Sequence, residues 1–537
     1  MLDVARSGSP RTWRRLSLLA VLAALCGCGG GNAAPSGPFG GTSWIPGIFQ
    51  PSSRYQALCA SPRTGTDPIT AQPYPDRPGS TLDENNWLRS WTHELYLWYE
   101  EVQDVDPSLY TTSQYFQLMK TMQTTSSGSP KDRFHFTYPT SKWESLSQAG
   151  VAMGYGVQFE IVQGTAPRSI KVAYLQPVSS LPAQTAAADL IRGDTVLTID
   201  GADVVNATDQ TSINTINAGL VPSAAGESHT FSIKDPGSST PRTVTLQAAK
   251  VTSIPVLVAT TVASPQTGST VGYILYNEQV DTAESELINA INALESKGVT
   301  DLVLDLRYNG GGLLDLASEL GYMIGGNQTA GQTFEREEFN SKYGATNPVT
   351  GQANTPTPFF DTTQGFSTTA GQPLPTLNLM RVVVITGHDT CSASESIING
   401  LRGVGVSVYQ IGSTTCGKPY GFYPQDNCGT TYFSIEFQGV NAKGVGGYGD
   451  GFSPQNTMPS AGVLLPGCSV ADDFGHALGD IAEGRLATAL AYLANPQAST
   501  CPAPPTGTAA PRSLGQRGLL ERIFVRSPLA QMRILRR

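Results

Sequence analysis

Residues 302–325 read LVLDLRYNGGGLLDLASELGYMIG, and this pattern carries the main evidence for the fold class. Leu302–Leu306 is a short apolar run typical of a buried strand, and Leu313–Ile324 has the apolar spacing of a helix. Gly272–Tyr276 reads as an earlier strand, with a helical pattern between the two strands. A strand–helix–strand unit of this kind predicts a parallel sheet with right-handed crossovers.

The helix between these two strands has recognisable ends. Asp281 and Glu284 have the spacing of a capping box, in which the first residue caps the helix and the second reaches back to it. Gly298 follows the last apolar residue of the helix and is typical of a helix end. The sequence therefore predicts a helix that starts at Asp281.

Three glycines, Gly310–Gly312, end the second strand and lead into the next helix. Backbone N–H groups at such a turn attract negative charge. A phosphate-binding loop is one interpretation, but no Gly-Lys-Ser/Thr follows and no Gly-x-Gly-x-x-Gly is present. The sequence of the turn therefore argues against nucleotide binding.

A second strand-to-helix turn contains the strongest candidate nucleophile. Arg381–Thr386 reads as a strand, and a helix is predicted up to about Arg402. Ser392 stands at the start of this helix, where its hydroxyl can be exposed and the next N–H, that of Ala393, can face an oxyanion. A serine at a helix start is more often only a cap, so this feature alone does not establish a catalytic role.

Together with two later segments, these turns resemble the C-terminal processing peptidases, also called tail-specific proteases. The resemblance spans roughly residues 81–460. Its motifs are the turn SASE at Ser392–Glu395, the pair Gly417-Lys418 that places Lys418 26 residues after Ser392, DLRYNGGG at Asp305–Gly312 and GDGFSP at Gly449–Pro454. It implies a multidomain α/β protein: an α/β serine-peptidase core with a parallel or mixed sheet (ClpP/crotonase-like), an inserted PDZ β domain and a small N-terminal helical domain.

The resemblance also implies a catalytic Ser/Lys dyad without a metal or cofactor. Ser392 would attack the scissile carbonyl, Lys418 would be the general base, and the N–H groups of Gly311 and Ala393 would form the oxyanion hole. A lysine accepts a proton only when it is neutral, and burial away from carboxylates disfavours its charged form.

Several positions depart from the family pattern. Phe422 stands where many members have Gln, and Pro419 directly follows the lysine. Arg402 or Gly403 stands where members commonly have Asp. Cys416 and Cys428 flank the lysine segment, and we consider a disulfide between them.

Residues 148–255 change to short β-type runs separated by turns, and they resemble a PDZ domain of the kind inserted in bacterial proteases. The first strand opens with Gly154, Tyr155, Gly156 and Val157, and a later segment, Ile191–Gly201, reads IRGDTVLTIDG. The resemblance implies that the glycine loop binds the terminal carboxylate of a peptide, which adds as an edge strand. An ordinary β domain with a glycine turn is the alternative.

The chain begins with the pattern of a secretory signal. Arginines precede the apolar run Leu16–Leu25, and the following residues up to Cys28 resemble a bacterial lipobox. Cys28 would then be the lipidated first residue of a protein anchored to a membrane on the periplasmic side of the cell envelope. Ordinary cleavage and an uncleaved anchor stay open. The six later cysteines favour disulfides, and the sequence does not choose among their 15 possible pairings.

The composition predicts six parts. They are a signal peptide (1–28), a Gly/Pro/Ser-rich linker (29–80), a helical domain (81–147), the PDZ-like domain (148–255), the α/β core (256–500) and a basic tail (501–537). Within them, helices are expected at Asp83–Glu101, Ser113–Met122 and Phe474–Leu493. For the tail, disorder, contact with a membrane surface and self-inhibition remain open.

Charge and composition exclude several functions. The net charge is −9, and 11 of the 34 basic residues lie in 1–28 and 512–537, so the acidic remainder does not suit nucleic acid. No apolar run is long enough for a polytopic membrane protein, and no His-Glu-x-x-His zinc motif occurs.

Three functions remain. The first is a Ser/Lys endopeptidase that acts on proteins or peptides with free C-termini. The second is a catalytically silent PDZ scaffold at the envelope. The third is a Ser-His hydrolase with His388 as its base, which is disfavoured because His388 stands only four residues before the serine.

Overall fold

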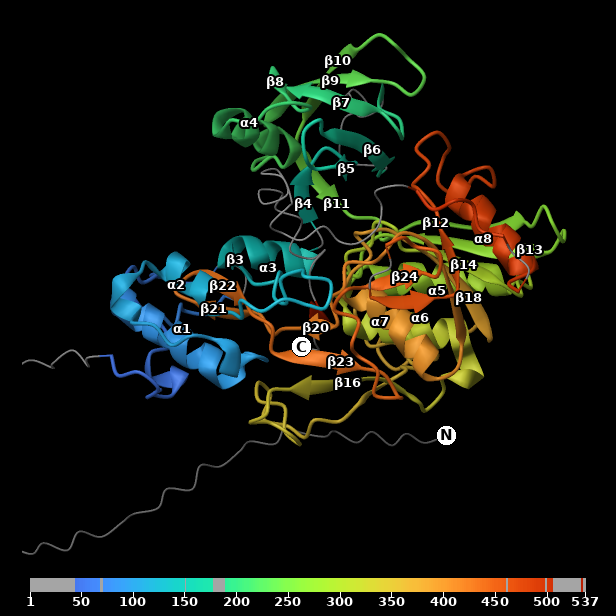
Figure 1. The fold of residues 1–537 in the computed structure, drawn as a ribbon. Helices are drawn as coiled ribbons and strands as arrows, with labels where there is room; N and C mark the ends of the chain where they lie inside the picture. Colours follow the sequence, from blue (N-terminus) through green and yellow to red (C-terminus); the bar gives the residue numbers. More distant parts are fainter. Residues whose placement is uncertain are drawn as a thin grey trace, which may run out of the picture. The chain divides into compact units, whose positions relative to one another are not determined.

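The computed structural model describes residues 44–67, 71–149, 151–176, 189–459, 462–497, 500–505 and 533–534 (Figure 1). The predicted signal peptide and Cys28 lie outside these residues. Within the described part of the chain, no helix combines the length and the apolar character needed to cross a bilayer.

The sheet that carries the candidate site has six strands in the order β12-β13-β14-β18-β19-β26. Their bounds are Val256–Ala263, Thr270–Tyr276, Leu302–Asp305, Arg381–Thr386, Ser407–Gly412 and Gly467–Ser469. The strands from β13 to β26 run parallel, and β12 pairs antiparallel at one edge. The predicted mixed sheet is therefore confirmed, and its apolar strands are typical of a sheet covered on both faces.

Helices cover both faces of this sheet because alternate strand residues point in opposite directions. On one face Leu304 and Val384 pack in the core that includes α5 (Ala283–Glu295), α6 (Leu314–Gly325) and α7 (Ala393–Gly403). On the other face Val303 and Val383 pack with α8 (Gly484–Ala494). Figure 1 shows α6 and α7 beside each other, and α8 apart from these two helices.

Two predicted helix starts are wrong. Helix α5 starts after Thr282 instead of Asp281, and no side chain caps it, because the Glu284 carboxylate accepts hydrogen bonds from the loop at residues 364–368. Helix α8 starts ten residues later than predicted. Its cap is Glu483, whose carboxylate accepts from the Leu486 N–H at 2.9 Å, and residues 474–483 form turns instead of helix.

A second sheet, in the order β10-β9-β7-β6-β5, has its own apolar core and lies in the region where short β-type runs were predicted. Its elements are β5 (Val157–Gln163), β6 (Ser169–Leu175), β7 (Thr195–Ile199), β8 (Ala202–Asp203), α4 (Gln210–Leu220), β9 (Ser228–Lys234) and β10 (Arg242–Gln247). The chain enters and leaves this part through a two-stranded ribbon of β4 (Val151–Gly154) and β11 (Ala249–Thr252).

The helical region contains α1 (Thr81–Leu95), α2 (Thr112–Leu118) and α3 (Thr140–Ala149). Trp87 and Trp91 of α1 are buried and stack at 5.1 Å between ring centroids, as the predicted apolar stripe implies. Helix α1 ends six residues earlier than predicted. Strand β3 (Phe136–Pro139) pairs with β22 (Thr430–Phe433), so this region shares a small sheet with the later part of the chain.

The remaining strands are short. They are β1 (Leu58–Cys59), β2 (Arg77–Pro78), β15 (Gly312–Leu313), β16 (Thr333–Phe339), β17 (Thr357–Pro358), β20 (Tyr420–Gly421), β21 (Gln425–Asn427), β23 (Phe437–Val440), β24 (Phe452–Pro454), β25 (Val463–Leu465) and β27 (Arg533–Ile534). Strands β17-β16-β23-β20 form a separate antiparallel sheet, part of which lies just after the lysine segment in the chain.

All six described cysteines form disulfides. The pairs are Cys59–Cys428, Cys391–Cys416 and Cys468–Cys501. The disulfide considered between Cys416 and Cys428 is therefore wrong, because each of these residues has a different partner.

Candidate active site

The two predicted turns meet because β14 and β18 are neighbouring parallel strands, whose carboxyl ends lie at the same edge of the sheet. Hydrogen bonds join the turns directly. The Cys391 N–H donates to the Asn309 carbonyl at 3.1 Å, and the Thr390 hydroxyl donates to the Leu306 carbonyl at 2.7 Å. The glycine turn and the serine turn therefore form one rigid unit.

Gly311 lies directly against Ser392. Its φ is +98°, and a Cβ at this position would lie 2.7 Å from the Cys391 carbonyl oxygen and 2.9 Å from the Ala393 nitrogen. Any side chain here would be strained and would clash, so the close approach requires glycine. The fold thus brings together the two predicted oxyanion-hole residues, Gly311 and Ala393. The Gly311 N–H donates to Asn309 Oδ1 at 2.9 Å in this state.

Ser392 has a strained backbone and a buried hydroxyl. Its φ is +58° and ψ is −120°, an unusual conformation for a residue with a side chain. The side chain is 0 % exposed, and its Oγ has no hydrogen-bond partner among the described residues. Backbone strain and an unsatisfied buried polar group are both costly, and they concentrate at functional sites.

Lys418 is also 0 % exposed. Its Nζ lies 4.2 Å from the centre of the Phe422 ring and 5.2 Å from that of the Phe134 ring. Phe422 is the residue that replaces the glutamine found in many family members, and it packs directly on the amine. Phe134 comes from the segment just before β3, so the helical region contributes to the surroundings of the lysine.

Glu395 connects the serine to the lysine segment. Its Oε2 accepts from the Ser392 N–H at 3.0 Å and from the Lys418 N–H at 2.8 Å. Its Oε1 accepts from the Gly417 N–H at 2.9 Å and from the Thr415 hydroxyl. One buried carboxyl group therefore fixes two segments that are distant in the sequence.

Burial raises the pKa of Glu395 above its ordinary value, although the hydrogen bonds that it accepts oppose this shift. A carboxyl group with a raised pKa carries less negative charge at a given pH. It therefore does less to favour a positive charge in its surroundings. From the sequence, Glu395 stands out only as part of the SASE motif. The signal that could have identified it is its place three residues after the helix cap.

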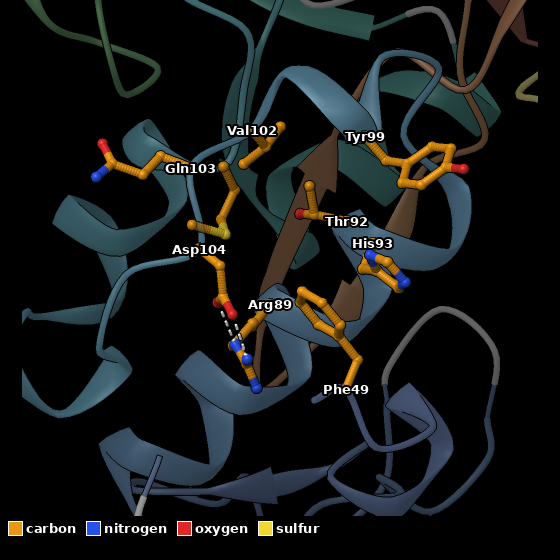
Figure 2. Close-up of a pocket in the computed structure, with 9 residues that line it drawn as sticks. Phe49, Arg89, Thr92, His93, Tyr99, Val102, Gln103 and Asp104 are labelled. Atoms are coloured by element: carbon orange, nitrogen blue, oxygen red, sulfur yellow. Dashed lines mark hydrogen bonds and ion pairs between the residues drawn. The ribbon is translucent and has the colours of Figure 1, made fainter. Parts of the chain in front are cut away.

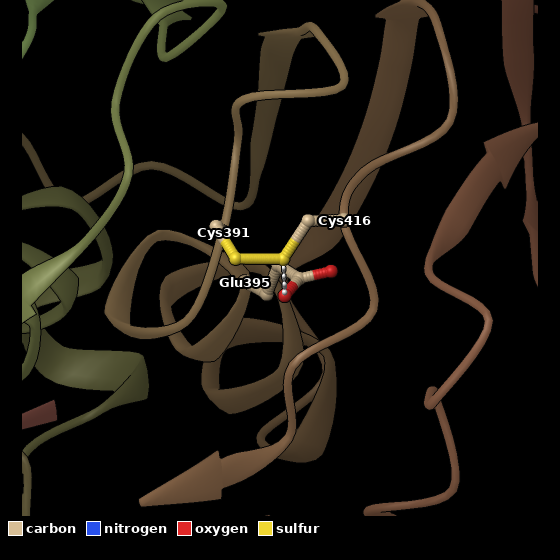
Figure 3. Close-up of side chains that lie close together, drawn as sticks. All are labelled: Cys391, Glu395 and Cys416. Atoms are coloured by element: carbon tan, nitrogen blue, oxygen red, sulfur yellow. Dashed lines mark hydrogen bonds between the residues drawn. A yellow bond between two sulfur atoms is a disulfide. The ribbon is translucent and has the colours of Figure 1, made fainter. Parts of the chain in front are cut away.

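The disulfide Cys391–Cys416 lies beside Glu395 and links the same two segments covalently (Figure 3). Cys391 directly precedes Ser392, and Cys416 stands two residues before Lys418. The sulfur atoms and the Glu395 carboxylate are close enough to suggest a metal site. Both sulfurs are bonded to each other, however, so no thiolate is available as a ligand.

The GDGFSP motif packs against the backbone of the lysine segment. A Cβ on Gly417 would lie 2.4 Å from the Gly449 carbonyl oxygen, and a Cβ on Gly451 would lie 2.3 Å from the Thr415 carbonyl oxygen. These glycines allow two backbones to touch. Asp450 accepts hydrogen bonds from the hydroxyls of Thr125 and Ser127, which attaches the motif to the helical region.

A buried ion cluster fixes the other side of the glycine turn. The Arg307 guanidinium contacts Asp305 at 2.8 Å, Asp472 at 2.7 Å and Glu483 at 2.8 Å. Bonds to several carboxylates at once hold a guanidinium in one orientation. The turn that carries Gly311 is therefore fixed at its first residue by Arg307 and within it by Asn309.

His388 lies near the serine in sequence but faces another group. Its Nε2 lies 3.1 Å from Glu160 Oε1, on β5, and 3.6 Å from the Asp389 carboxylate. Its side chain is 48 % exposed, whereas that of Ser392 is buried. These contacts do not favour His388 as the base for Ser392.

The predicted peptide-binding residues lie where β4 leads into β5. Gly154 ends β4, where it pairs with Ala249 of β11, and Val157 begins β5, the last strand in the order of its sheet. Tyr155 is only 3 % exposed, and its hydroxyl donates to the Gly219 carbonyl at 2.8 Å. Gly156 has φ +73°. The Tyr155 side chain is thus a core residue, so only backbone groups of this loop could bind a peptide.

One small cavity lies in the helical region, far in sequence from the serine turn (Figure 2). Its volume is about 20 Å³, roughly the room that one water molecule needs. Its lining includes Phe49 and His93, and Arg89 pairs with Asp104. The cavity is too small for a peptide, so we do not assign it to the reaction.

Comparisons with known proteins show what this part of the chain is similar to. Residues 270–421 match Peptidase family S41, and this range includes Gly311, Ser392, Ala393 and Lys418. An S41 protease structure from Bacteroides fragilis is 20 % identical with a TM-score of 0.51, and the match covers 76 % of this chain and 96 % of that one. At this identity the likeness supports the fold.

Two curated relatives give the narrower group. A carboxyl-terminal-processing protease of Picosynechococcus sp. is 28 % identical over 51 % of this chain and 56 % of its own length. Another, of Synechocystis sp., is 25 % identical over 48 % of this chain and 51 % of its own length. Together these matches support the C-terminal processing peptidase family as the group that this chain resembles. The match spans about half the length of these relatives.

Proposed function

We propose that this chain is a serine endopeptidase that cleaves proteins near their C-termini through Ser392 and Lys418. The observation that carries this proposal is the arrangement around Glu395. The carboxylate accepts from the N–H groups of both Ser392 and Lys418, while Gly311 packs against the serine. Two buried groups of the right chemistry are thus held on one support.

In the proposed reaction, neutral Lys418 takes the proton of the Ser392 hydroxyl as the oxygen attacks the scissile carbonyl. The resulting oxyanion is stabilised by the N–H groups of Gly311 and Ala393. The lysine then protonates the leaving amine, and water hydrolyses the acyl-enzyme. Gly311 must share its N–H or release it from Asn309, because that bond is present before substrate binds.

The aromatic surroundings of Lys418 suit the role of a base. The Phe134 and Phe422 rings help to bury the amine, and burial disfavours its charged form. The faces of these rings also attract an ammonium ion, so burial must outweigh this attraction for Lys418 to be neutral. Because the reaction needs the neutral amine, we expect activity to rise from acidic to alkaline pH. An acidic optimum would contradict the dyad.

We infer that the β region at residues 148–255 is a PDZ domain that binds substrate C-termini. Support comes from β5, an edge strand that begins directly after the turn with Gly156. A peptide could pair with this edge while backbone N–H groups of the turn bind its carboxylate. We also propose that the protein is secreted and anchored to a membrane of the cell envelope through lipid on Cys28.

The test compares hydrolysis of a peptide with a free apolar C-terminus by the native chain, Ser392→Ala and Lys418→Ala. Both substitutions should abolish cleavage while circular dichroism and melting temperature show a folded protein. Substantial residual cleavage by either variant would refute the dyad. Mass spectrometry of proteins captured by Ser392→Ala would then identify natural substrates.

The second candidate is a catalytically silent PDZ scaffold. Strand β5, the last in the order of its sheet among the described residues, would serve such a protein equally well. Binding of C-terminal peptides without any hydrolysis by the native chain would favour it. Intact Ser392 and Lys418, both buried on one support, favour the peptidase.

A further inference from the structure

The short strand β15, Gly312–Leu313, directly follows Gly311 and has a partner on each side. On one side it pairs with Gln279, since the Leu313 N–H donates to the Gln279 carbonyl at 2.8 Å. On the other side it pairs in parallel with β27, in the register Gly312↔Arg533 and Leu313↔Ile534. The C-terminal end of the chain is therefore a strand of the sheet beside the candidate oxyanion hole.

Strand β27 also lies against β20, Tyr420–Gly421. Strand β20 begins two residues after Lys418, just as β15 begins one residue after Gly311. The C-terminal strand is thus in contact with the two segments that carry the proposed base and the proposed oxyanion donor. An extended substrate that reached Ser392 would need this same place.

We propose that the C-terminal tail of this chain occupies the substrate-binding edge of β15 and competes with substrate in cis. This inference rests on the proposed peptidase function. The occupant is the segment that includes Arg533 and Ile534, and it binds through its backbone as an added strand. The tail is the intramolecular inhibitor, and exchange with a substrate strand opens the site.

Chain length and charge both support this occupant. From Pro505 to Arg533 there are 28 residues, which span up to roughly 90 Å when extended, so the length of the chain allows Arg533 to lie at β15. Residues 512–537 contain seven arginines and one glutamate, whereas the rest of the chain after residue 28 is strongly acidic. Opposite charges favour association of the tail with the body.

Covalent attachment makes the tail an effective competitor even if its pairing is weak. A tethered segment acts at an effective concentration of about 1 mM. It can be displaced by a substrate that binds at more than one point, as a peptide held by a second domain would. Ser392 and Lys418 are both 0 % exposed, so the site is closed to solvent in this state.

The first experiment measures proximity in the full chain and does not depend on activity. The double variant Leu313→Cys/Ile534→Cys joins paired positions, whose spacing in a sheet suits a disulfide. Mild oxidation and mass spectrometry of peptides should detect this cross-link. The matched control, Leu313→Cys/Ser513→Cys, places the second cysteine elsewhere in the tail. Cross-linking no more frequent than in the control would overturn the proposal.

The second experiment measures competition. The full-length variant Arg533→Pro/Ile534→Pro loses the N–H groups of the strand. We expect a KM about tenfold lower than that of the native chain with kcat unchanged, since the competitor is removed. Added peptide of residues 526–537 should inhibit this variant competitively, and the same peptide with both prolines should not. An unchanged KM would overturn competition by the tail.

If the peptidase proposal itself fails, a binding measurement still tests whether the tail occupies β15. If neither the native chain nor the proline variant hydrolyses peptides, fluorescence anisotropy of a labelled 526–537 peptide gives the answer. Binding to the proline variant that is tighter than binding to the native chain supports occupation of the edge by the tail. Equal binding to both overturns it.

Discussion

Two buried glutamates stand in the first turn of a helix, and they support different kinds of structure. Glu284 of α5 accepts from the N–H groups of Gly365, Ser367 and Thr368, all within one loop. Glu395 of α7 accepts from the N–H groups of Ser392 and Lys418, on two segments that carry candidate catalytic groups. Both side chains are 0 % exposed.

The two glutamates differ in the direction of their pKa shifts. Burial acts to raise the pKa of Glu284, but the hydrogen bonds from Ser367, Gly365 and Thr368 outweigh burial, and the pKa lies below its ordinary value. For Glu395 burial prevails, and the pKa lies above its ordinary value. A loop anchor can be fully charged. Under the proposed dyad, Lys418 must be neutral, and a carboxyl group that holds the Lys418 backbone would suit that role better with less charge. On this proposal, similar geometry would serve stability at Glu284 and chemistry at Glu395.

The largest effect on kcat is expected from removing the Glu395 carboxylate. Glu395→Ala should lower kcat about 100-fold, because the serine and lysine segments lose their common support and a small misplacement of reacting groups is costly. Glu284→Ala should leave kcat unchanged and lower the free energy of unfolding by roughly 3 kcal/mol, because buried N–H groups lose their acceptor. Peptide hydrolysis and urea denaturation of both variants measure the two quantities.

The contrast fails if Glu284→Ala loses as much kcat as Glu395→Ala at a temperature where both are folded. Glu395→Gln is a further control, since it keeps the shape of the neutral acid. It should retain more activity than Glu395→Ala.

Two of the disulfides can be compared in the same way, because one joins the serine and lysine segments and the other does not. Cys391→Ala/Cys416→Ala should lower kcat only about tenfold, because Glu395 still joins the two segments. Cys59→Ala/Cys428→Ala should leave kcat unchanged but destabilise the fold more. In the loop-entropy description, separations of 25 and 369 residues correspond to about 3.5 and about 6 kcal/mol. Calorimetry and steady-state kinetics test both, and a larger loss of kcat in the second pair would reverse the interpretation.

The last prediction concerns the pH dependence of stability, not activity, and involves Glu319, a neighbour of Glu284. Burial and the charge of Glu284 raise the pKa of Glu319 from 4.5 to about 9. Between these pH values the folded chain keeps a proton that the unfolded chain has lost, so this group lowers stability as pH rises. Glu319→Gln should match the native chain near pH 4 and exceed it by up to roughly 5 kcal/mol at pH 8, about 1.4 kcal/mol for each pH unit above 4.5. An equal difference at both pH values would show that the effect is not one of ionisation.

Much of the core was predictable because its strands and helices have strong local patterns. The apolar run at Leu302–Leu306 and the strand–helix–strand pattern predicted a parallel sheet. That the turns of Gly311 and Ser392 meet was implied by the family resemblance. The mixed sheet has this arrangement, and the turns lie in contact.

Other features depend on contacts that no local pattern specifies. Glu284 has the spacing of a cap, but its carboxylate oxygens accept from a loop some 80 residues later. The disulfide partner of Cys416 is Cys391, which only the meeting of two strand ends determines. The role of Glu395 and the packing of Phe134 on Lys418 likewise arise from tertiary contacts. The strand formed by Arg533 and Ile534 has no apolar alternation that would predict it.

The most direct test of the dyad is covalent labelling of the full chain with a fluorophosphonate, which transfers its phosphonyl group to an activated serine and loses fluoride. Intact-mass and peptide mass spectrometry should find one adduct, on Ser392, in the native chain, and none in Lys418→Ala with its disulfides intact. Labelling of Ser392 at the same rate without Lys418, or labelling of a different serine, would contradict the account.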